Sequence, residues 1–357
     1  MSAPPPQPIP VIAGPTAGGK TALAVELALA LAGRGTPAEI ITADAYQIYQ
    51  GMDIGTAKPS IEERRGIPHH LLDLRDPRDP TPFTVHDWLR EANAAIADIQ
   101  SRGKTPIIVG GTHLYAKALL DGLFDGPGAD PALREQLRAK GLPALREELE
   151  RVDPQAAQRI HANDERRTIR ALEVFHLTGK PISAHQTQWD SAEAPSAGKE
   201  TGRRDGSTSP IASARTSKPR NLDTSTPRFL LVGLDWPSEK INPRINARVR
   251  HMMDAGFLDE VRALHASNAF APTANPQARE ALGYKQLLAH IERRVPLDEA
   301  VERIKIDTRH FAKAQRTWLK RLRTATDALF IAAADAPTPE MARQIGAKLG
   351  AEVLRPF

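Results

Sequence analysis

The chain has 357 residues, 41% hydrophobic and 25% charged, so it can bury a sizeable core in one domain with an insertion or in two domains. It has no cysteine, which excludes disulfides, thiolate catalysis and cysteine-ligated zinc, and its net charge of +5 weakly suggests a polyanionic partner. The Pro-rich residues 1–10 lack the layout of a signal peptide, and no apolar run is long enough to span a membrane. We therefore expect a disordered N-terminus and a cytoplasmic protein with no membrane partner.

A phosphate-binding loop follows the N-terminus. The apolar residues 9–13 predict a strand and the Ala- and Leu-rich residues 21–31 predict a helix. In such a loop, backbone N–H groups and the helix dipole hold phosphate, the lysine adds charge, and the threonine hydroxyl can bind Mg²⁺. The loop does not say which phosphate is bound or whether a phosphoryl group moves. Between strand and helix, the motif G-x-x-x-x-G-K-T consists of Gly14, Pro15, Thr16, Ala17, Gly18, Gly19, Lys20 and Thr21.

Strands and helices then alternate along the chain. Residues 39–43 predict a second strand that ends at Asp44, residues 88–102 a helix, residues 105–109 a third strand, and residues 113–120 another helix. This alternation predicts an α/β fold in which a parallel sheet is covered by helices on both faces. Asp44 would then lie at the carboxyl edge of the sheet beside the phosphate loop, where it could bind metal, accept a proton or cap the next segment.

The third strand argues against ATP hydrolysis. Enzymes that transfer or hydrolyse the γ-phosphate often hold Mg²⁺ with an acid at the end of such a strand. Here the strand runs into Gly110, Gly111 and Thr112 instead. This favours a protein that holds a pyrophosphate group without cutting a phosphoanhydride bond.

The remaining chain changes character twice. We expect residues 9–128 to form the first part of the core and residues 129–189 to form an all-helical insertion. Residues 190–227 are too poor in large apolar side chains to fold, so we expect a disordered linker there. Residues 228–357 then continue the core, beginning with a strand. Within them, residues 303–323 carry eight Lys or Arg against one acid, which favours nucleic-acid contact over a merely solvated helix face.

Nine blocks in order resemble the tRNA dimethylallyltransferases. Individually several are short, but together they cover most of residues 9–323 outside the linker. The blocks are GPTAGGKT (14–21), ADAYQIY (43–49), GMDIGTAKP (51–59), HHLLDLRDP (69–77), VGGTHLYAKAL (109–119), ADPALR (129–134), RIHANDERRTIRALEV (159–174), AREALGYKQ (278–286) and TRHFAKAQRTW (308–318).

The resemblance implies transfer of a dimethylallyl group from dimethylallyl diphosphate to the exocyclic amino group of the adenosine next to the tRNA anticodon, with Mg²⁺ as cofactor. It implies that Lys20 and Thr21 hold the leaving group, Asp44 is the general base, Thr112 acts at the reacting base and Arg248 lies near the diphosphate. It also implies contacts with the anticodon stem-loop of one tRNA, which suits a monomer. These tRNA-binding residues are Asp44, Ala45, Tyr46, Gln47, Thr112, Arg134, Arg166, Arg167, Thr168, Ile169, Arg170, Arg279, Gly283, Tyr284, Lys285, Gln286, Arg309, Lys313, Gln315 and Arg316.

Three positions depart from the family pattern. Gly18 and Ala45 each stand where serine is usual, and Ala314 where arginine is usual. These changes remove two hydroxyls and one phosphate contact, but they leave Lys20, Thr21 and Asp44 in place. We expect them to affect fine tuning rather than the reaction.

Three alternatives remain open from sequence. A small-molecule kinase would leave the segments after residue 129 without a role. A prenyltransferase acting on free AMP or ATP would not need the basic helices. A non-catalytic RNA-binding protein would not need an intact Lys20, Thr21 and Asp44.

Overall fold

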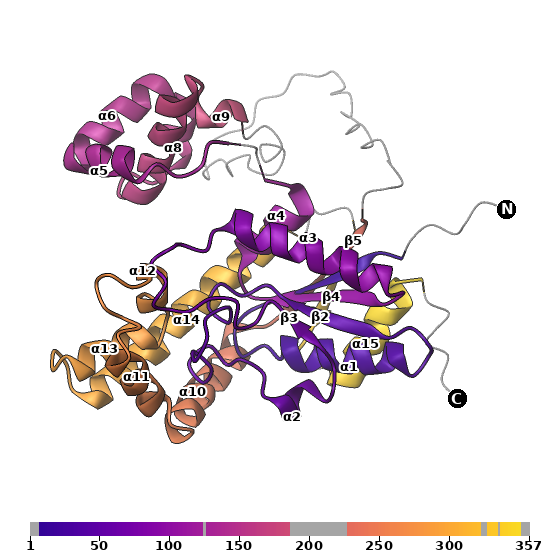
Figure 1. The fold of residues 1–357 in the computed structure, drawn as a ribbon. Helices are drawn as coiled ribbons and strands as arrows, with labels where there is room; N and C mark the ends of the chain where they lie inside the picture. The colour runs from indigo at the N-terminus through magenta and orange to yellow at the C-terminus, as the bar shows by residue number, and fades with distance from the viewer. Residues whose placement is uncertain (1–6, 124–125, 186–226, 323–326, 335, 351–357) are drawn as a thin grey trace, which may run out of the picture. The chain divides into compact units, whose positions relative to one another are not determined.

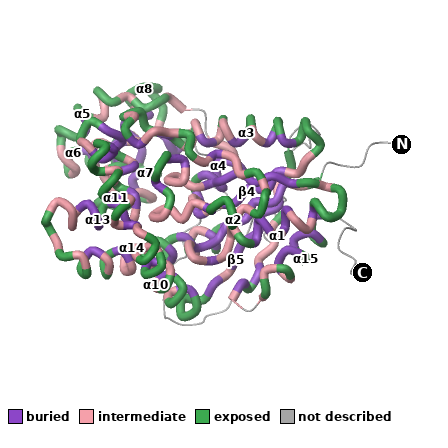
Figure 2. The backbone as a smooth tube through the Cα atoms, turned by 60° about the horizontal axis from the view of Figure 1, so that its bottom comes forward, coloured by how far each residue is buried: buried purple, intermediate pink, exposed green. Residues whose placement is uncertain are grey.

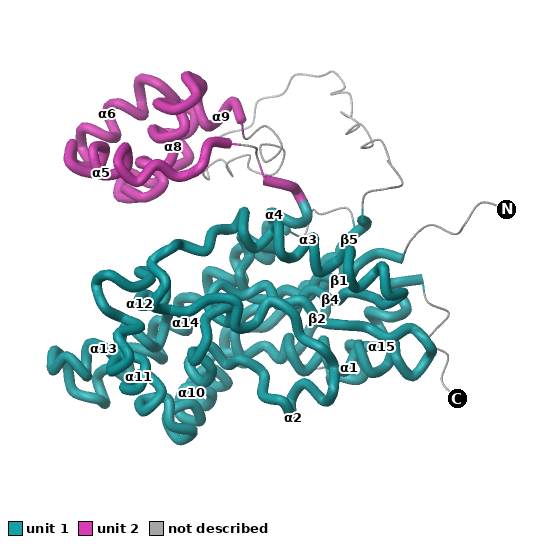
Figure 3. The backbone as a smooth tube through the Cα atoms, viewed as in Figure 1, with its two compact units in different colours: residues 1–120, 219–357 teal, residues 121–218 magenta. Residues whose placement is uncertain are grey.

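The computed structural model describes residues 7–123, 126–185, 227–322, 327–334 and 336–350. The disordered N-terminus expected at 1–10 and the linker expected at 190–227 fall outside these ranges, except for residues 7–10 and 227. The chain divides into two compact units (Figure 3). Unit 1 comprises residues 1–120 and 219–357, and unit 2 comprises residues 121–218.

Unit 1 is built on a parallel sheet (Figure 1). The sheet has six strands, in the order β3-β2-β4-β1-β5-β6. The parallel sheet expected from the alternating sequence is confirmed. The two edge strands were not expected, because β3 has only two residues and β6 follows a long helical segment. The strands are β1 (Ile9–Ala13), β2 (Ala38–Thr42), β3 (His69–His70), β4 (Thr105–Gly110), β5 (Phe229–Asp235) and β6 (Ala328–Ala332).

Helices cover both faces of this sheet, and alternate residues of each strand point to opposite faces. On one face, Ile12 and Ile40 pack in a cluster with α1 (Lys20–Ala32) and α15 (Thr338–Lys348). Figure 2 shows that the strands are buried between the helices of the two faces.

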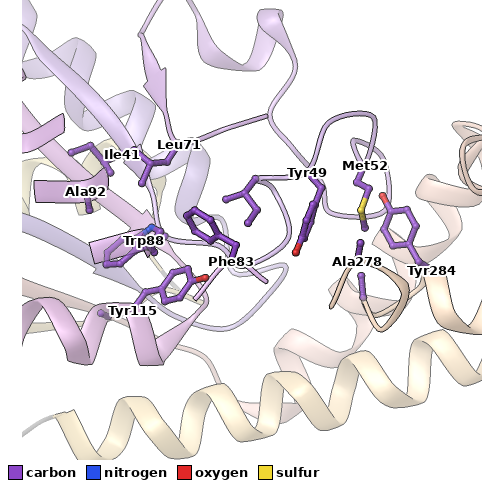
Figure 4. Packing of buried hydrophobic residues seen from close by; sticks show 14 of the residues in the cluster. Ile41, Tyr49, Met52, Leu71, Phe83, Trp88, Ala92, Tyr115, Ala278 and Tyr284 are labelled. Carbon is purple, nitrogen blue, oxygen red and sulfur yellow. The ribbon is translucent and has the colours of Figure 1, made fainter. Parts of the chain in front are cut away.

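On the other face, Ile41 packs with α3 (Val85–Ser101) and α4 (His113–Asp121). The rings of Trp88 in α3 and Tyr115 in α4 stack with centroids 4.6 Å apart (Figure 4). The Trp88 indole N–H also donates to the Thr42 carbonyl oxygen at 3.0 Å, which ties α3 to the end of β2. This face therefore fixes the place where β2 ends and the candidate site begins.

The rest of unit 1 is helical. Its longest helix, α14 (Leu297–Arg321), is amphipathic, and its buried Leu319 packs with Ala13 of β1 and Leu231 of β5. This packing brings α14 close to the strand that precedes the phosphate loop. The other helices are α2 (Ile61–Arg64), α10 (Ser238–Asp254), α11 (Phe257–Ala266), α12 (Pro276–Arg279) and α13 (Tyr284–Ile291).

The described part of unit 2 is entirely helical. Its core contains Leu137, Leu145, Leu149 and Leu172, contributed at helical spacing by three helices. Aspartates 130, 153 and 164 cap three of the helices by accepting backbone N–H hydrogen bonds. The helices are α5 (Pro131–Ala139), α6 (Leu142–Val152), α7 (Pro154–Arg159), α8 (Glu165–Thr178) and α9 (Ile182–His185).

Across the described ranges, we find no helix that is both long and apolar enough to cross a lipid bilayer.

Candidate functional site

The carboxyl ends of four neighbouring parallel strands, β2, β4, β1 and β5, lie at one edge of the sheet, where α/β proteins bind ligands. β1 leads into the phosphate loop, β2 into Asp44 and β4 into Gly110 and Gly111. A Cβ on Gly110 would lie 1.9 Å from the Ala43 carbonyl oxygen, so only glycine allows the ends of β2 and β4 to approach this closely. The loops predicted to carry the chemistry therefore meet.

The phosphate loop has the geometry of an anion site. Gly19 has φ 79°, a left-handed conformation that glycine adopts readily, and α1 begins directly after it at Lys20. The first turn of α1 contains no acid, so its free N–H groups and positive dipole end are not neutralised by a side chain of that turn. Lys20 Nζ folds back over the loop and donates to the Pro15 carbonyl oxygen at 2.8 Å.

Three charges gather at the loop: Lys20, Arg248 and Asp44. Burial and the nearby Arg248 guanidinium lower the pKa of Lys20 to about 8, and the Asp44 carboxylate opposes that shift. Burial also lowers the pKa of Arg248, again opposed by Asp44. Arg248 makes no hydrogen bond to any residue that the structure describes, so its guanidinium is free to bind a ligand. Two close cations beside a helix N-terminus favour an anion with several charges.

Asp44 is held by its own turn. Its Oδ1 accepts backbone N–H hydrogen bonds from Tyr46 at 2.9 Å and from Gln47 at 3.3 Å. Both of these hydrogen bonds use Oδ1, and Oδ2 accepts no hydrogen bond from the residues that the structure describes. Asp44 therefore has the position and the open oxygen that a proton acceptor requires.

The neighbours of Asp44 are tied to other loops. Thr112 Oγ1 accepts the backbone N–H of Ala45 at 3.1 Å. The side-chain amide of Gln47 donates to the carbonyl oxygens of Thr56 and Ala57, both at 3.1 Å. Thr112 thus fixes the segment after β2, whereas the Gln47 amide N–H₂ supports the following loop.

Gln315 lies elsewhere than on the expected tRNA-facing surface. Its side chain is only 3% exposed. Its Oε1 accepts the backbone N–H of Thr16 at 2.7 Å, and its Nε2 donates to the Gly111 carbonyl oxygen at 2.9 Å. Both ends of the amide are therefore used inside the protein, between the phosphate loop and the end of β4.

Sequence reasoning missed the residues after β5. Trp236 Nε1 donates to the Gly18 carbonyl oxygen at 3.2 Å, and Arg244 Nε donates to the Ala17 carbonyl oxygen at 3.0 Å. The Arg244 guanidinium lies 4.8 Å from the centre of the Trp236 ring. These side chains support the outer side of the phosphate loop. The sequence did show Asp235 and Trp236 at the end of a predicted strand. Because that strand, β5, pairs with β1, its end lies beside the phosphate loop.

The predicted tRNA-binding residues of unit 2 separate into exposed and buried groups. Arg166 and Arg167 are exposed at the start of α8. Thr168 and Ile169 are 0% and 5% exposed, and the Thr168 hydroxyl donates to the Asp164 carbonyl oxygen, so these two side chains serve the fold.

Arg134 and Arg170 bind a buried acid, Glu173. Arg134 Nε donates to Glu173 Oε1 at 2.8 Å, and Arg170 Nη1 donates to Oε2 at 2.5 Å. Burial would raise the pKa of Glu173, but these hydrogen bonds and one from the Asp130 amide hold it below its ordinary value. Both arginines are partly exposed at the same time, so their structural role is observed and their tRNA contact stays a prediction.

The predicted residues of α12 and α13 are mostly enclosed. Gly283, Tyr284 and Gln286 are buried, whereas Lys285 is exposed. Gln286 Oε1 accepts the Gly283 N–H and its Nε2 donates to Asp307, so the Gln286 amide is occupied. Of these four residues, Lys285 is the one that is exposed, and its tRNA contact stays a prediction.

Three arginines complete the predicted set. Arg279 donates to the Phe270 carbonyl oxygen and to Glu292 Oε1, Arg309 donates to Asn246 Oδ1 at 2.7 Å, and Arg316 donates to the Trp236 carbonyl oxygen at 3.2 Å. All three are partly buried.

The exposed side of α14 carries a basic groove of about 420 Å³. The ammonium of Lys117 and the guanidinium of Arg321 each lie 5.8 Å from the centre of the Trp318 ring. An aromatic ring flanked by cations suits a nucleotide. The groove is lined by His310, Lys313, Ala314, Thr317, Trp318 and Arg321.

The described residues contain no group of three or more His, Asp or Glu side chains that could hold a metal ion. At the phosphate loop the chain offers the Thr21 hydroxyl as an oxygen donor. This donor set fits Mg²⁺, which takes few protein ligands and completes its shell with phosphate oxygens and water.

Comparisons with known proteins agree with this geometry. A sequence model of a family described as IPP transferase matches residues 47–322. The chain is 44% identical over 314 residues to tRNA dimethylallyltransferase 1 of Trichlorobacter lovleyi, covering 87% of this chain and 90% of that protein. It is 43% identical to the tRNA dimethylallyltransferase of Syntrophobacter fumaroxidans, covering 88% and 81% of the two chains.

Solved structures give the same result. The fold resembles the full-length tRNA isopentenylpyrophosphate transferase of Bacillus halodurans with a TM-score of 0.62 and 32% identity, covering 97% of each chain. It also resembles a eukaryotic dimethylallyltransferase acting on tRNA, with a TM-score of 0.68 and 27% identity over 92% of this chain and 75% of that one.

Proposed function

The chain belongs to the IPP transferase family, and from this premise we propose that it transfers a dimethylallyl group from dimethylallyl diphosphate to the exocyclic amino group of an adenosine adjacent to the tRNA anticodon. The observation that carries the proposal is the meeting of an anion-binding loop with a carboxylate. Lys20, Arg248 and the start of α1 attract one polyanion, and Asp44 lies beside them.

This arrangement suits attack on carbon. The adenine amino group is a weak nucleophile, because its lone pair is delocalised into the ring, so the allylic carbon must be activated through its leaving group. As the C–O bond breaks, negative charge develops on the diphosphate, where Lys20, Arg248 and the loop N–H groups stabilise it. The new C–N bond forms, and Asp44 Oδ2 accepts the proton that the nitrogen loses.

Mg²⁺ would be held by the Thr21 hydroxyl and would neutralise charge on the diphosphate. Thr112 would keep the segment carrying Asp44 in place, through its hydrogen bond to the Ala45 N–H. Tyr46 and Gln47 follow Asp44 directly and would line the pocket for the base.

We assign the tRNA backbone to the exposed cations and the helical insertion. Arg166 and Arg167 of α8 and Lys285 and Lys313 are exposed, and a target base in a loop can be extruded cheaply because it is unpaired. We also propose that the enzyme acts as a monomer that binds one tRNA, and that it works in the cytoplasm, where tRNA is used.

A single assay distinguishes the candidate functions. The protein is incubated with Mg²⁺ and labelled dimethylallyl diphosphate, and with unmodified tRNA, AMP or ATP in parallel. We expect label in tRNA only. Label in AMP or ATP would support a nucleotide prenyltransferase, and ATP turnover without prenyl transfer would support a kinase. Tight tRNA binding without turnover would support a non-catalytic RNA-binding protein.

A further inference from the structure

We propose that Gln315 is a positioning residue that sets the distance between the two halves of the active site. This inference rests on the proposed function. Its basis is that one buried amide joins the phosphate loop, at the Thr16 N–H, to the end of β4, at the Gly111 carbonyl.

The Gln315 amide contacts Gly111 so closely that position 111 has no room for a side chain. Gly111 has no side chain, and a Cβ there would lie 2.5 Å from Gln315 Nε2, so glycine is what permits the amide to approach. The same added Cβ would lie 3.7 Å from Lys20 Nζ, which places the Gln315 contact next to the lysine of the phosphate loop.

The contact also continues to Asp44. Gly111 precedes Thr112, whose hydroxyl accepts the Ala45 N–H, and Ala45 follows Asp44. Gln315 therefore connects the loop that would hold the diphosphate to the segment that carries Asp44, the proposed general base. Each half has other supports: Trp236 and Arg244 support the phosphate loop, and Asp44 is held by its own turn. Loss of Gln315 should leave each half able to bind but misalign them.

Misalignment has a kinetic signature that differs from a lost tRNA contact. Transfer requires the amino nitrogen, the allylic carbon and the leaving oxygen to be in line, and a displacement of about 1 Å can cost about a hundredfold in rate. A tRNA contact on the basic face of α14 would instead change tRNA affinity and its salt dependence.

The test is Gln315→Met, which keeps length and removes both hydrogen bonds. We expect kcat to fall by about thirtyfold or more, with the Kd for tRNA and for inorganic pyrophosphate changed by less than about threefold. The matched control is Gln344→Met on the exposed side of α15, which should behave as wild type. An unchanged kcat, or a loss confined to tRNA affinity, overturns the proposal.

Gly111→Ala breaks the same contact from the other side and serves if Gln315→Met does not fold. It should lower kcat similarly, and the double variant should be no slower than the worse single variant, because one contact is lost only once. Additive losses in the double variant would contradict the proposal. A wild-type protein that transfers no prenyl group to tRNA would instead count against the proposed function.

Discussion

The hydroxyl of Thr112 accepts the backbone N–H of Ala45 at 3.1 Å, and this hydrogen bond joins the ends of β4 and β2 next to Asp44. The two strands are neighbours in the sheet, and the Thr112 backbone N–H also donates to the Ala43 carbonyl oxygen at 3.3 Å, so Thr112 makes two links between their ends beside Asp44. Ala45 has no side-chain hydroxyl, so its backbone N–H is the group that bonds to Thr112 Oγ1.

Thr112→Val tests this support. Valine has the same shape as threonine but cannot accept a hydrogen bond. The Ala45 N–H is therefore left unpaired, at a cost of about 1 to 3 kcal/mol. We expect kcat for prenyl transfer to fall by about tenfold or more if that cost is felt in the transition state. Thr112→Ser keeps the hydroxyl and should retain most of the activity. Equal rates for valine and serine would show that the hydroxyl is dispensable.

Binding of diphosphate should depend on the protonation of Lys20. The pKa of Lys20 is about 8 in the free protein, because burial and Arg248 disfavour its charge. A bound polyanion raises that pKa, so binding above this pH requires proton uptake, and affinity should fall by up to about tenfold for each further pH unit. Below it, Lys20 is already charged and affinity should be flat with respect to this group.

Calorimetry of inorganic pyrophosphate binding in two buffers of different ionisation enthalpy measures this uptake. Lys20→Arg is the control, because arginine stays charged and leaves only the ionisation of pyrophosphate itself. The same proton uptake in Lys20→Arg as in wild type would rule out Lys20 as the titrating group.

The positions of the central predicted residues in the fold could be deduced from the sequence, whereas the positions of the residues that support them could not. The phosphate loop is a local motif, and a residue following a strand must lie at the edge of the sheet, so Lys20, Thr21 and Asp44 could be placed in advance. Gln315 could not be, because its partner Thr16 lies 299 residues away and an amide on a basic helix has no local pattern that distinguishes burial from exposure.

The buried charge of Glu173 could not be predicted from the sequence either. Glu173 lies among arginines in the sequence of α8 and looks like part of a solvated face, yet it is 0% exposed and binds Arg134 and Arg170. Strand β3 was missed because two residues show no hydrophobic periodicity, and β6 was missed because it follows a long helical segment.

Glu173→Gln should loosen unit 2. Replacing the carboxylate leaves two arginines without their buried counter-charge, and breaking such a pair costs about 3 kcal/mol. We expect faster amide hydrogen exchange across α5 and α8 in this variant. Glu150→Gln, at an exposed position of α6, is the matched control and should exchange as wild type does. Identical exchange in both variants would mean that the Glu173 cluster contributes little.

The exposed arginines of α8 should report on tRNA. Arg166→Gln with Arg167→Gln should weaken tRNA binding and reduce the slope of log affinity against log salt by about one to two, because fewer phosphate counterions are released. The control is Arg151→Gln, also exposed in unit 2 and outside the predicted site. A salt slope equal to that of wild type in the double variant would remove these residues from the tRNA interface.

The most direct measurement is the single-turnover rate of prenyl transfer to tRNA by Asp44→Asn, made alongside its affinity for tRNA. Asparagine keeps the oxygen that accepts the Tyr46 and Gln47 N–H groups but cannot take the proton. We predict a loss of about a hundredfold or more in rate, with tRNA affinity within a few fold of wild type, whereas Asp254→Asn, exposed at the end of α10, should be unaffected. Transfer by Asp44→Asn at the wild-type rate would contradict the central claim that Asp44 accepts the proton beside the bound diphosphate.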